Sequence, residues 1–300
     1  MSGMKNKMKN KYKGIFPALV TPFDKNGKVN TDALGKLVER NIELGVNGFY
    51  VGGSTGESYL LSKKERMQVL EAVIEAANRR VDVIVNVGVF ATEHGIELAK
   101  HAEKFGAAAI SSVPPFYFAF NMEEYVQYYN EIVSSVEIPM IVYNIPAMSG
   151  IELSKQNIEE LFKNEKIVGI KHTSYNLFQM EKIIDEYPEK SVFIGHDEVF
   201  LSAYAAGAEA AIGSTFNFTS KKFIKIQEFF GEGKMAEALE IQSQINAVIE
   251  VLCKIGVIKG VKAALKMQGI DCGVCRKPFA ALSKEDEKQL EAFLLKTGCL

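Results

Sequence analysis

Lys171 follows the apolar residues 168–170 and precedes a polar segment that begins at His172. The apolar residues predict a short buried strand with the lysine at its carboxyl end. Because burial disfavours the ammonium form, a lysine at such a position supplies a neutral amine, which attacks carbonyl carbons. We therefore expect Lys171 to form a Schiff base with a pyruvate-like 2-keto acid. Two other interpretations stay open: the lysine turns toward solvent, or it pairs with a carboxylate.

The segment 52–58, with the sequence GGSTGES, is rich in glycine and hydroxyl groups. Its three glycines let the backbone turn sharply and direct several N–H groups toward one anion. The hydroxyls of Ser54 and Thr55 add donors that suit a flat carboxylate. A phosphate-binding loop is excluded because no Gly-Lys pair follows. The alternative is a glycine-rich turn that ends in an ordinary helix cap.

Tyr143 ends another short apolar run, 140–143, and is followed by the sequence NIP. A tyrosine at the end of a strand can transfer a proton when its hydroxyl reaches the reacting centre. The alternative is an amphipathic aromatic side chain at the rim of the fold. This pattern taken by itself leaves both interpretations open.

Acidic and hydroxyl groups follow two further apolar runs, in the segments 195–198 (GHDE) and 213–217 (GSTFN). In a turn that opens a helix, both Asp197 and Glu198 can accept hydrogen bonds from a polyol. The alternative is that they cap the following helix, whose positive end favours carboxylates. We hold both interpretations for this pair.

Metal and hydrolase chemistry find little support in the sequence. The four histidines are scattered, Cys272 and Cys275 form a lone CxxC, and a structural zinc site needs four ligands. The G-x-S-x-G elbow of serine hydrolases is absent. We therefore expect no metal site, and we interpret the cysteines as the reduced thiols of a cytoplasmic protein. No organic cofactor is expected, because Lys171 itself supplies the covalent chemistry.

Composition narrows the class of partner. The chain has 300 residues, 47% of them hydrophobic, and a net charge of −2. Near-neutral charge gives no reason to expect a nucleic acid or an anionic membrane surface, so a small molecule is the expected partner. No apolar run approaches the roughly 18 residues of a membrane-spanning helix. The basic segment 1–13 lacks the apolar stretch of a secretory signal and is interpreted as a disordered tail.

The elements that must position these residues alternate along the chain. Segments between the apolar runs have helical periodicity, as at Leu34, Leu37 and Val38, and residues 62–65 have the spacing of a capping box. Thr31-Asp32 precedes the first helix, and glycines at 45, 106 and 207 follow predicted helices. The runs lack period-2 alternation, as expected of parallel strands buried on both faces. The eight predicted strands are 14–20, 48–51, 83–87, 108–113, 140–143, 168–171, 192–194 and 210–212.

Eight strand–helix units close most simply into an α/β fold of the (β/α)8 TIM-barrel type. An open doubly wound sheet is the rival, but it has about five to seven strands. Four helices follow the eighth strand, at 220–230, 235–252, 256–267 and 284–295. The first is the eighth barrel helix, and the others form a three-helix C-terminal extension packed on the barrel. The expected division is a tail (1–13), a catalytic barrel (14–232) and the extension (233–300).

Four motifs in order resemble the N-acetylneuraminate lyase / dihydrodipicolinate synthase family. They are GSTGE at 53–57, YNIPA at 143–147, KHTS at 171–174 and GST at 213–215. The resemblance runs from about Ile15 to the C-terminus. Its sialic acid branch is the more similar one, through Ser54, the GHDE segment and CRKPF at 275–279. Two departures are the absence of the synthase arginine from 147–150 (AMSG) and Ile258 in place of an aromatic residue.

The resemblance implies roles for individual residues. It makes Lys171 the Schiff-base lysine and Tyr143 the proton-transfer residue, with Ser54 linked to Tyr143. It further implies that Ser54 and Thr55 bind the substrate carboxylate and that Tyr117 reaches a neighbouring subunit's site. Contacts with the polyol part of the substrate are implied for Thr173, Gly195, Asp197, Glu198 and Ser214.

The resemblance also implies an activity. It is class I aldolase cleavage of N-acetylneuraminate to N-acetylmannosamine and pyruvate, by a cytoplasmic homotetramer without a metal or other cofactor. Three alternatives stay open: a dihydrodipicolinate synthase, a 2-keto-3-deoxy sugar acid aldolase, and a barrel that binds a sugar acid without turnover.

Overall fold

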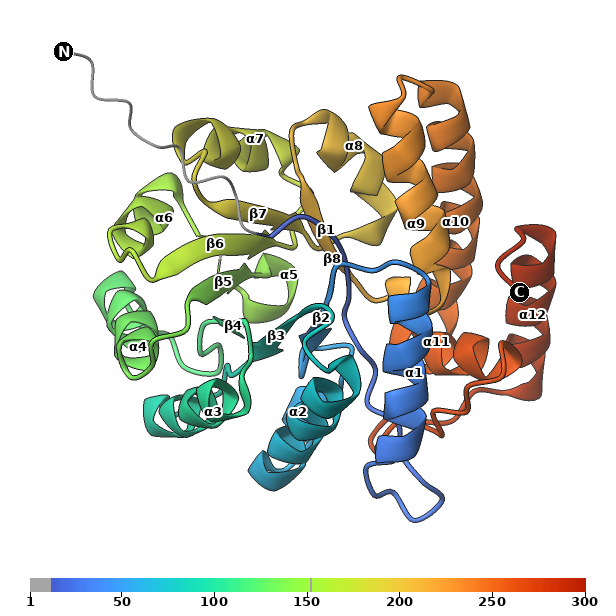
Figure 1. Ribbon diagram of the computed structural model, residues 1–300, viewed down its shortest axis with the longest axis horizontal. Helices are drawn as coiled ribbons and strands as arrows, with labels where there is room; N and C mark the ends of the chain where they lie inside the picture. Colours follow the sequence, from blue (N-terminus) through green and yellow to red (C-terminus); the bar gives the residue numbers. More distant parts are fainter. Residues whose placement is uncertain (1–11, 152) are drawn as a thin grey trace.

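The computed structural model describes residues 12–151 and 153–300. Eight parallel strands form one sheet in the order β1-β8-β7-β6-β5-β4-β3-β2 (Figure 1). The sheet closes where Leu19 N donates to Tyr50 O at 2.9 Å, beside the bridge between Ala18 and Tyr50. The strands are β1 Gly14–Pro17, β2 Gly48–Val51, β3 Asp82–Asn86, β4 Ala109–Ser112, β5 Met140–Asn144, β6 Ile167–His172, β7 Ser191–Ile194 and β8 Ala210–Gly213.

This arrangement confirms the predicted (β/α)8 barrel and excludes the open doubly wound sheet. Each predicted strand matches an observed one, with ends that differ by at most three residues. The largest difference is at β1, which ends at Pro17 instead of residue 20. Beyond Pro17, Ala18 still bridges to Tyr50 of β2, and Val20 N then donates to the side chain of Asn217 at 3.2 Å.

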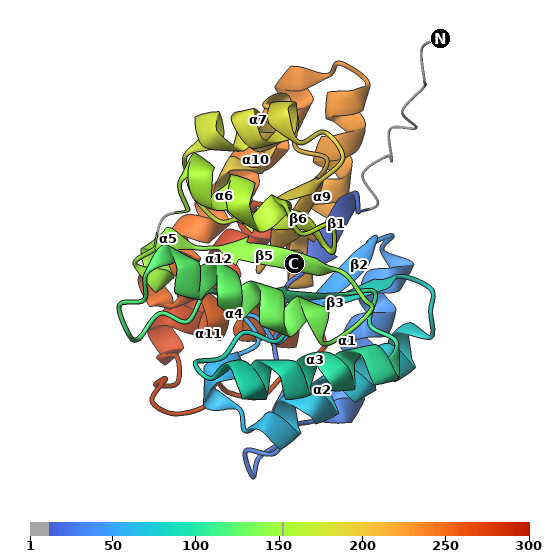
Figure 2. The ribbon, with the colours of Figure 1, turned by 90° about the vertical axis from the view of Figure 1, so that its left-hand side faces the viewer.

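Helices surround the strands (Figures 1 and 2). The Ser62 capping box is present, and glycines 45, 106 and 207 have positive φ angles, as predicted. The first helix begins at Thr31, two residues earlier than expected, because Asn30 caps it. The barrel helices are α1 Thr31–Glu43, α2 Lys63–Ala77, α3 Thr92–Phe105, α4 Met122–Ser134, α6 Lys155–Phe162, α7 Leu177–Glu186, α8 Phe200–Ala205 and α9 Phe216–Gly231.

Three short helical turns lie in the loops after β2, β5 and β7 and were not predicted. They are η1 Ser58–Leu60, α5 Pro146–Ser149 and η2 Asp197–Val199. All three follow the carboxyl ends of strands, where (β/α)8 barrels carry their functional groups. The loops of interest are therefore compact turns.

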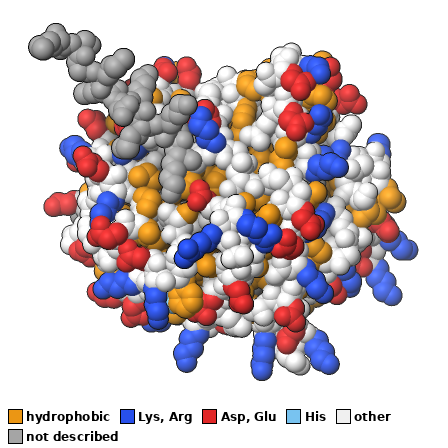
Figure 3. Space-filling model, in the orientation of Figure 1, with side chains coloured by type: hydrophobic (Ala, Val, Ile, Leu, Met, Phe, Trp, Pro, Cys, Tyr) orange, Lys and Arg blue, Asp and Glu red, His pale blue; other side chains and the backbone are white. Residues whose placement is uncertain are grey.

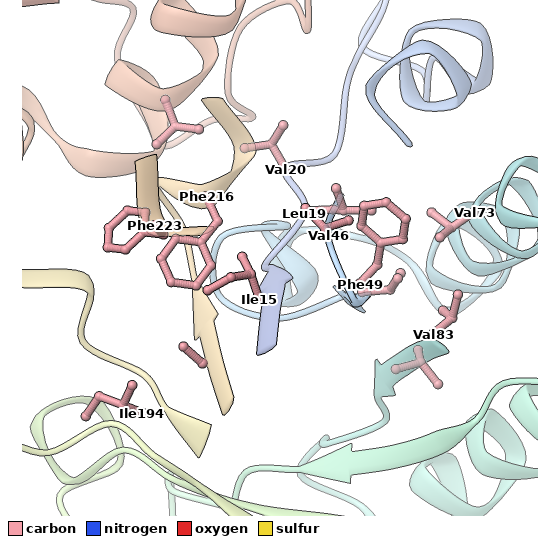
Figure 4. Close-up of a cluster of buried hydrophobic side chains, with 14 of the residues drawn as sticks. Ile15, Leu19, Val20, Val46, Phe49, Val73, Val83, Ile194, Phe216 and Phe223 are labelled. Carbon is pink, nitrogen blue, oxygen red and sulfur yellow. The ribbon is translucent and has the colours of Figure 1, made fainter. Parts of the chain in front are cut away.

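Apolar side chains fill two layers. One layer lies inside the barrel and includes Phe16, Tyr50, Ile141 and Phe193. The other lies between the strands and the helices, and Figure 4 shows part of it around Ile15, Phe49, Phe216 and Phe223. Successive side chains of a strand point to opposite faces, so each strand contributes to both layers. This explains why the strands read as continuous apolar runs.

The C-terminal extension consists of α10 Met235–Ile255, α11 Val257–Met267 and α12 Lys284–Lys296, as predicted. Helix α10 runs beside α9 (Figure 1). Within the described chain, no helix is both long and apolar enough to cross a membrane. Figure 3 shows acidic and basic side chains interspersed over one face, which agrees with the near-neutral net charge.

The predicted disordered tail is wrong for Tyr12 and Lys13, while residues 1–11 lie outside the described part. Tyr12 is 1% exposed, and its hydroxyl donates to the carbonyl of Ala108 at 3.0 Å. Its ring lies 6.1 Å from that of Phe193, and Lys13 pairs with Glu209. An aromatic ring placed just before β1 fills the amino-terminal end of the barrel interior, and that burial orders the segment.

Replacing Tyr12 by alanine removes this ring from the core. We expect Tyr12→Ala to lower the free energy of unfolding by about 3–5 kcal/mol, and Tyr12→Phe by only about 1 kcal/mol, because phenylalanine loses the hydrogen bond alone. Urea unfolding followed by circular dichroism measures both changes. Equal stability of Tyr12→Ala and the wild type would contradict the packing role.

Candidate active site

Lys171 lies inside the barrel, near the carboxyl end of β6. It is 4% exposed, and its register partners are Tyr143 on β5 and Phe193 on β7. Across residues 12–151 and 153–300, no carboxylate lies within ion-pair distance of its ammonium group. The structure therefore excludes both alternatives, a lysine turned to solvent and a lysine in an ion pair.

Two tyrosine rings flank the amine of Lys171. Its Nζ lies 3.7 Å from the ring centroid of Tyr143 and 5.1 Å from that of Tyr50 on β2. The two rings meet edge to face with centroids 5.9 Å apart, and the Tyr50 hydroxyl donates to Ser111 Oγ at 3.1 Å. Burial raises the pKa of Tyr50 well above its usual range, so this hydroxyl stays protonated. Tyr143 is thus a neighbour of the amine and not a rim residue.

Tyr50 was missed by the sequence analysis. It lies within the predicted strand 48–51, where an aromatic residue is read as core, and its distance from Lys171 along the chain hides their contact. His172, the next residue after the lysine, lies on the opposite face of β6. Burial lowers the pKa of His172 to about 4, and its Nε2 donates to the carbonyl of Asn176 at 3.1 Å. It is a neutral structural residue.

The GGSTGES loop follows β2 as a tight turn. The amides of Gly56 and Glu57 donate to the carbonyls of Gly53 and Ser54, both at 3.0 Å. Ser54 is exposed and Thr55 half-buried, so their hydroxyls lie at the rim of the barrel mouth. The described part of the chain holds no hydrogen bond between Ser54 and Tyr143, and that link stays a prediction.

Glu57 anchors this loop to the C-terminal extension. Its backbone is left-handed, with φ 56°, and its side chain is fully buried. One carboxylate oxygen accepts from Lys262 Nζ of α11 at 2.6 Å, and the other accepts from the amide of Arg276 at 2.7 Å. Lys262 is 2% exposed and also donates to the carbonyl of Val274. The extension therefore holds the candidate carboxylate loop from outside the barrel.

Asp197 faces the loop after β8. Its Oδ2 accepts from the amide and the hydroxyl of Thr215, at 2.8 and 2.6 Å. Burial raises the pKa of Asp197 to about 6, although the bonds from Thr215 and the charge of Lys171 act in the opposite direction. Its side chain makes no cap hydrogen bond to η2 or α8. The helix-cap interpretation is wrong for this residue.

Thr173 and Gly195 lie against each other beside Asp197. A Cβ atom built on Gly195 would be 1.9 Å from Thr173 Oγ1, so only glycine fits there. The Thr173 hydroxyl is buried and has no partner within the described chain, which is expected of a group that meets a ligand. Ser214, the residue before Thr215, is half-buried. The structure thus brings four of the predicted polyol-binding residues together.

The side chain of Glu198 lies in a different environment from that of Asp197. The hydroxyl of Tyr175 donates to Glu198 Oε1 at 2.5 Å, and His196 Nδ1 lies 3.3 Å from the same oxygen. Burial alone raises the pKa of Glu198, but the bonds from His196 and Tyr175 outweigh it and lower that pKa to about 2. Glu198 is therefore a fixed, charged acceptor. Tyr175 was missed because it directly follows the KHTS motif and is not part of it.

Tyr117 lies outside this cluster, on the loop between β4 and α4. It is 77% exposed, and it belongs to an exposed aromatic patch with Tyr59, Phe90 and Phe118. The centroids of Phe90 and Tyr117 are 6.3 Å apart, and those of Tyr59 and Phe90 are 5.7 Å apart. Tyr59 follows the GGSTGE turn, so the patch adjoins the candidate carboxylate loop.

Within the described residues, no group of three or more histidine, cysteine, aspartate or glutamate side chains lies close enough to hold a metal ion. The four cysteines are free thiols. Burial raises the pKa of Cys272 to about 12 and that of Cys275 to about 11, so both thiols are protonated near neutral pH. Of the CxxC pair, Cys275 lies beside the Glu57 side chain.

The fold and the site define a (β/α)8-barrel enzyme with a buried lysine between two tyrosines at its centre. The sequence matches the model of the Dihydrodipicolinate synthetase family over residues 11–297, and the chain belongs to this family. It is 41% identical over 282 residues to an N-acetylneuraminate lyase from Citrobacter koseri. The aligned residues make up 93% of this chain and 95% of the relative.

Solved structures agree with this assignment. CdNal from Clostridium difficile, solved in complex with mannosamine, is 36% identical and superposes with a TM-score of 0.93, covering 96% of this chain and 100% of that one. A catalytic lysine mutant of the Ruminococcus gnavus sialic acid aldolase is 32% identical with a TM-score of 0.93, covering 97% and 99%.

Removing the cation of the buried pair leaves a carboxylate without its partner. We expect Lys262→Met to lower the free energy of unfolding by about 3–5 kcal/mol, because an unpaired buried charge is costly. Chemical denaturation measures the change. As a control, Glu39→Gln removes the exposed Glu39–Arg80 pair and should leave the unfolding midpoint unchanged. Equal effects of the two substitutions would refute the anchoring role.

Proposed function

We propose that this enzyme is a class I aldolase that cleaves N-acetylneuraminate to N-acetylmannosamine and pyruvate. The observation that carries the proposal is the position of Lys171, buried at the centre of the barrel with its Nζ 3.7 Å from the ring centroid of Tyr143. The choice of N-acetylneuraminate as the substrate is supported by the relatives at 41% identity, which are N-acetylneuraminate lyases.

The reaction begins at the amine. The neutral nitrogen of Lys171 attacks the C2 ketone of the open-chain sugar acid, and Tyr143 gives its phenolic proton to the departing hydroxyl, so that loss of water leaves a protonated imine and an ionised Tyr143. Tyr143 accepts the proton of the C4 hydroxyl as the C3–C4 bond breaks, and the bonding electrons move into the imine to form an enamine. N-acetylmannosamine leaves as the aldehyde. Protonation of the enamine at C3 and hydrolysis of the imine then release pyruvate and free Lys171.

Substrate binding is divided between two groups of loops. The hydroxyls and amides of Ser54 and Thr55 bind the carboxylate, with Ser54 also guiding the proton of Tyr143. The polyol end lies across Thr173, Gly195 and Ser214 and is bound by Asp197 and Glu198. The support is their clustering at the carboxyl ends of β6, β7 and β8.

The alternative reactions of this family use the same Schiff base on Lys171 and differ in the aldehyde that is cleaved off or added. A dihydrodipicolinate synthase needs a cation after Tyr143 for a second carboxylate, whereas this chain has Ala147, Met148 and Ser149 there. Cleavage assays with N-acetylneuraminate and 2-keto-3-deoxygluconate separate the lyase from a sugar acid aldolase. A barrel that only binds its ligand would show neither activity.

We also propose that the enzyme is a cytoplasmic homotetramer. The exposed patch of Tyr59, Phe90, Tyr117 and Phe118 supports a subunit contact, because monomers rarely leave neighbouring aromatic side chains in solvent. Such a contact brings Tyr117 toward the carboxylate loop of a neighbouring subunit. Free thiols at all four cysteines are compatible with a reducing compartment.

Trapping the imine tests the proposed nucleophile. With pyruvate and sodium borohydride, we expect a reduced pyruvyl group on Lys171, found by peptide mass spectrometry. Lys190 is the internal control: burial lowers its pKa, yet its Nζ donates to the carbonyl of Ile167 at the opposite end of β6, and it should stay unlabelled. Lys171→Ala should lose activity by roughly 10³-fold or more. Full activity in this variant would rule the mechanism out.

The raised pKa of Asp197 predicts that substrate binding depends on pH. Its ionised carboxylate accepts charge-assisted hydrogen bonds from substrate hydroxyls, and these weaken on protonation, so KM for the sugar acid should rise about tenfold as pH falls from 7 to 5, through its pKa of about 6. Because the pKa of Asp197 is raised in the folded state, this residue stabilises the fold below about pH 4, and the contribution is lost as pH rises through 6. Acid therefore does not unfold the protein through Asp197. Asp197→Asn should abolish the inflection; a persistent one would assign it elsewhere.

A further inference from the structure

Tyr175 is an exposed aromatic residue with an ordered position. It lies in the loop after β6, and 65% of its surface is exposed. Its ring nevertheless stacks on that of His196, with centroids 4.2 Å apart and planes at 11°. Its hydroxyl donates to Glu198. Residues from two consecutive loops thus meet on one carboxylate.

The contacts on Glu198 restrain it from two sides. Tyr175 and His196 both reach Oε1, and Asn246 Nδ2 of α10 donates to the backbone carbonyl at 3.1 Å. The hydrogen bond to Glu198 raises the pKa of Tyr175 to about 12, so the phenol remains a donor at neutral pH. Backbone and side chain are therefore both held, and the second carboxylate oxygen, Oε2, is oriented relative to the barrel mouth.

We propose that Tyr175, stacked on His196, is a positioning residue that fixes Glu198 to receive the terminal hydroxyls of a long sugar acid and thereby selects for substrate length. This inference rests on the proposed function and extends it to Tyr175, which lies outside the motifs, and to His196, which has no assigned role within the GHDE segment. Tyr175 acts on the polyol end of the site and not on the amine. Its loss should weaken binding of long substrates and spare the chemistry at Lys171.

The structure provides a chemical reason for this division. A charge-assisted hydrogen bond holds a flexible glutamate in one orientation, and a ligand then meets an acceptor that is already ordered. Pyruvate has no polyol chain, so its imine with Lys171 does not depend on Glu198. N-acetylneuraminate carries its glycerol chain at the end remote from the ketone and does depend on it.

The test compares Tyr175→Phe, which keeps the stacked ring and loses the hydroxyl, with Glu198→Gln and the double variant. We expect KM for N-acetylneuraminate to rise about tenfold in Tyr175→Phe, with kcat and the rate of borohydride trapping with pyruvate unchanged. The double variant should resemble Glu198→Gln alone, because the two residues act as one unit. Tyr187→Phe, the same change at the C-terminal end of α7, is the control and should match the wild type.

Other outcomes separate this inference from the proposed function. Wild-type cleavage of N-acetylneuraminate with an unchanged KM in Tyr175→Phe overturns the inference alone. Equal losses in cleavage and in pyruvate trapping also overturn it, since they indicate a general structural defect. A wild-type enzyme that traps pyruvate and does not cleave N-acetylneuraminate overturns the proposed function and this inference with it.

Discussion

The buried ion pair between Glu57 and Lys262 is the contact on which the architecture of the site depends. It joins the turn after β2 to helix α11, two segments 205 residues apart in the chain. The left-handed backbone of Glu57 and the amide of Arg276 complete the contact. A buried charge is stable only with its partner in place, so the turn and the extension must form together. The C-terminal helices are thus part of the catalytic architecture.

The same extension also reaches the opposite side of the barrel mouth. Gln242 and Asn246 of α10 donate to the carbonyls of Asp197 and Glu198. The loops proposed to bind the two ends of the substrate are therefore held by helices of one C-terminal unit. Rigid support of this kind keeps binding groups in place before the ligand arrives, which lowers the entropic cost of binding.

At the centre of the barrel, burial and aromatic contacts act on Lys171. The strands bring Tyr50 and Tyr143 to either side of the amine and shield it from solvent. The neighbouring polar groups differ in character: Asp197 is buried with a raised pKa, and Glu198 is charged and held at the rim. Adjacent carboxylates in the sequence thus receive different roles from their surroundings.

The sequence alone determined the eight strands, the helices between them and the strand-end positions of Lys171, Ser54, Tyr143 and Asp197, because apolar runs, caps and glycine turns are local signals. It did not predict the site contacts of Tyr50, Lys262 and Tyr175, or that Tyr12 is buried in the barrel. Each of these acts through a partner distant along the chain, and no local pattern records such a contact. Only closure of the barrel decided that Lys171 lies between two tyrosines and that Glu57 meets its cation, because burial and charge pairing are properties of the assembled fold.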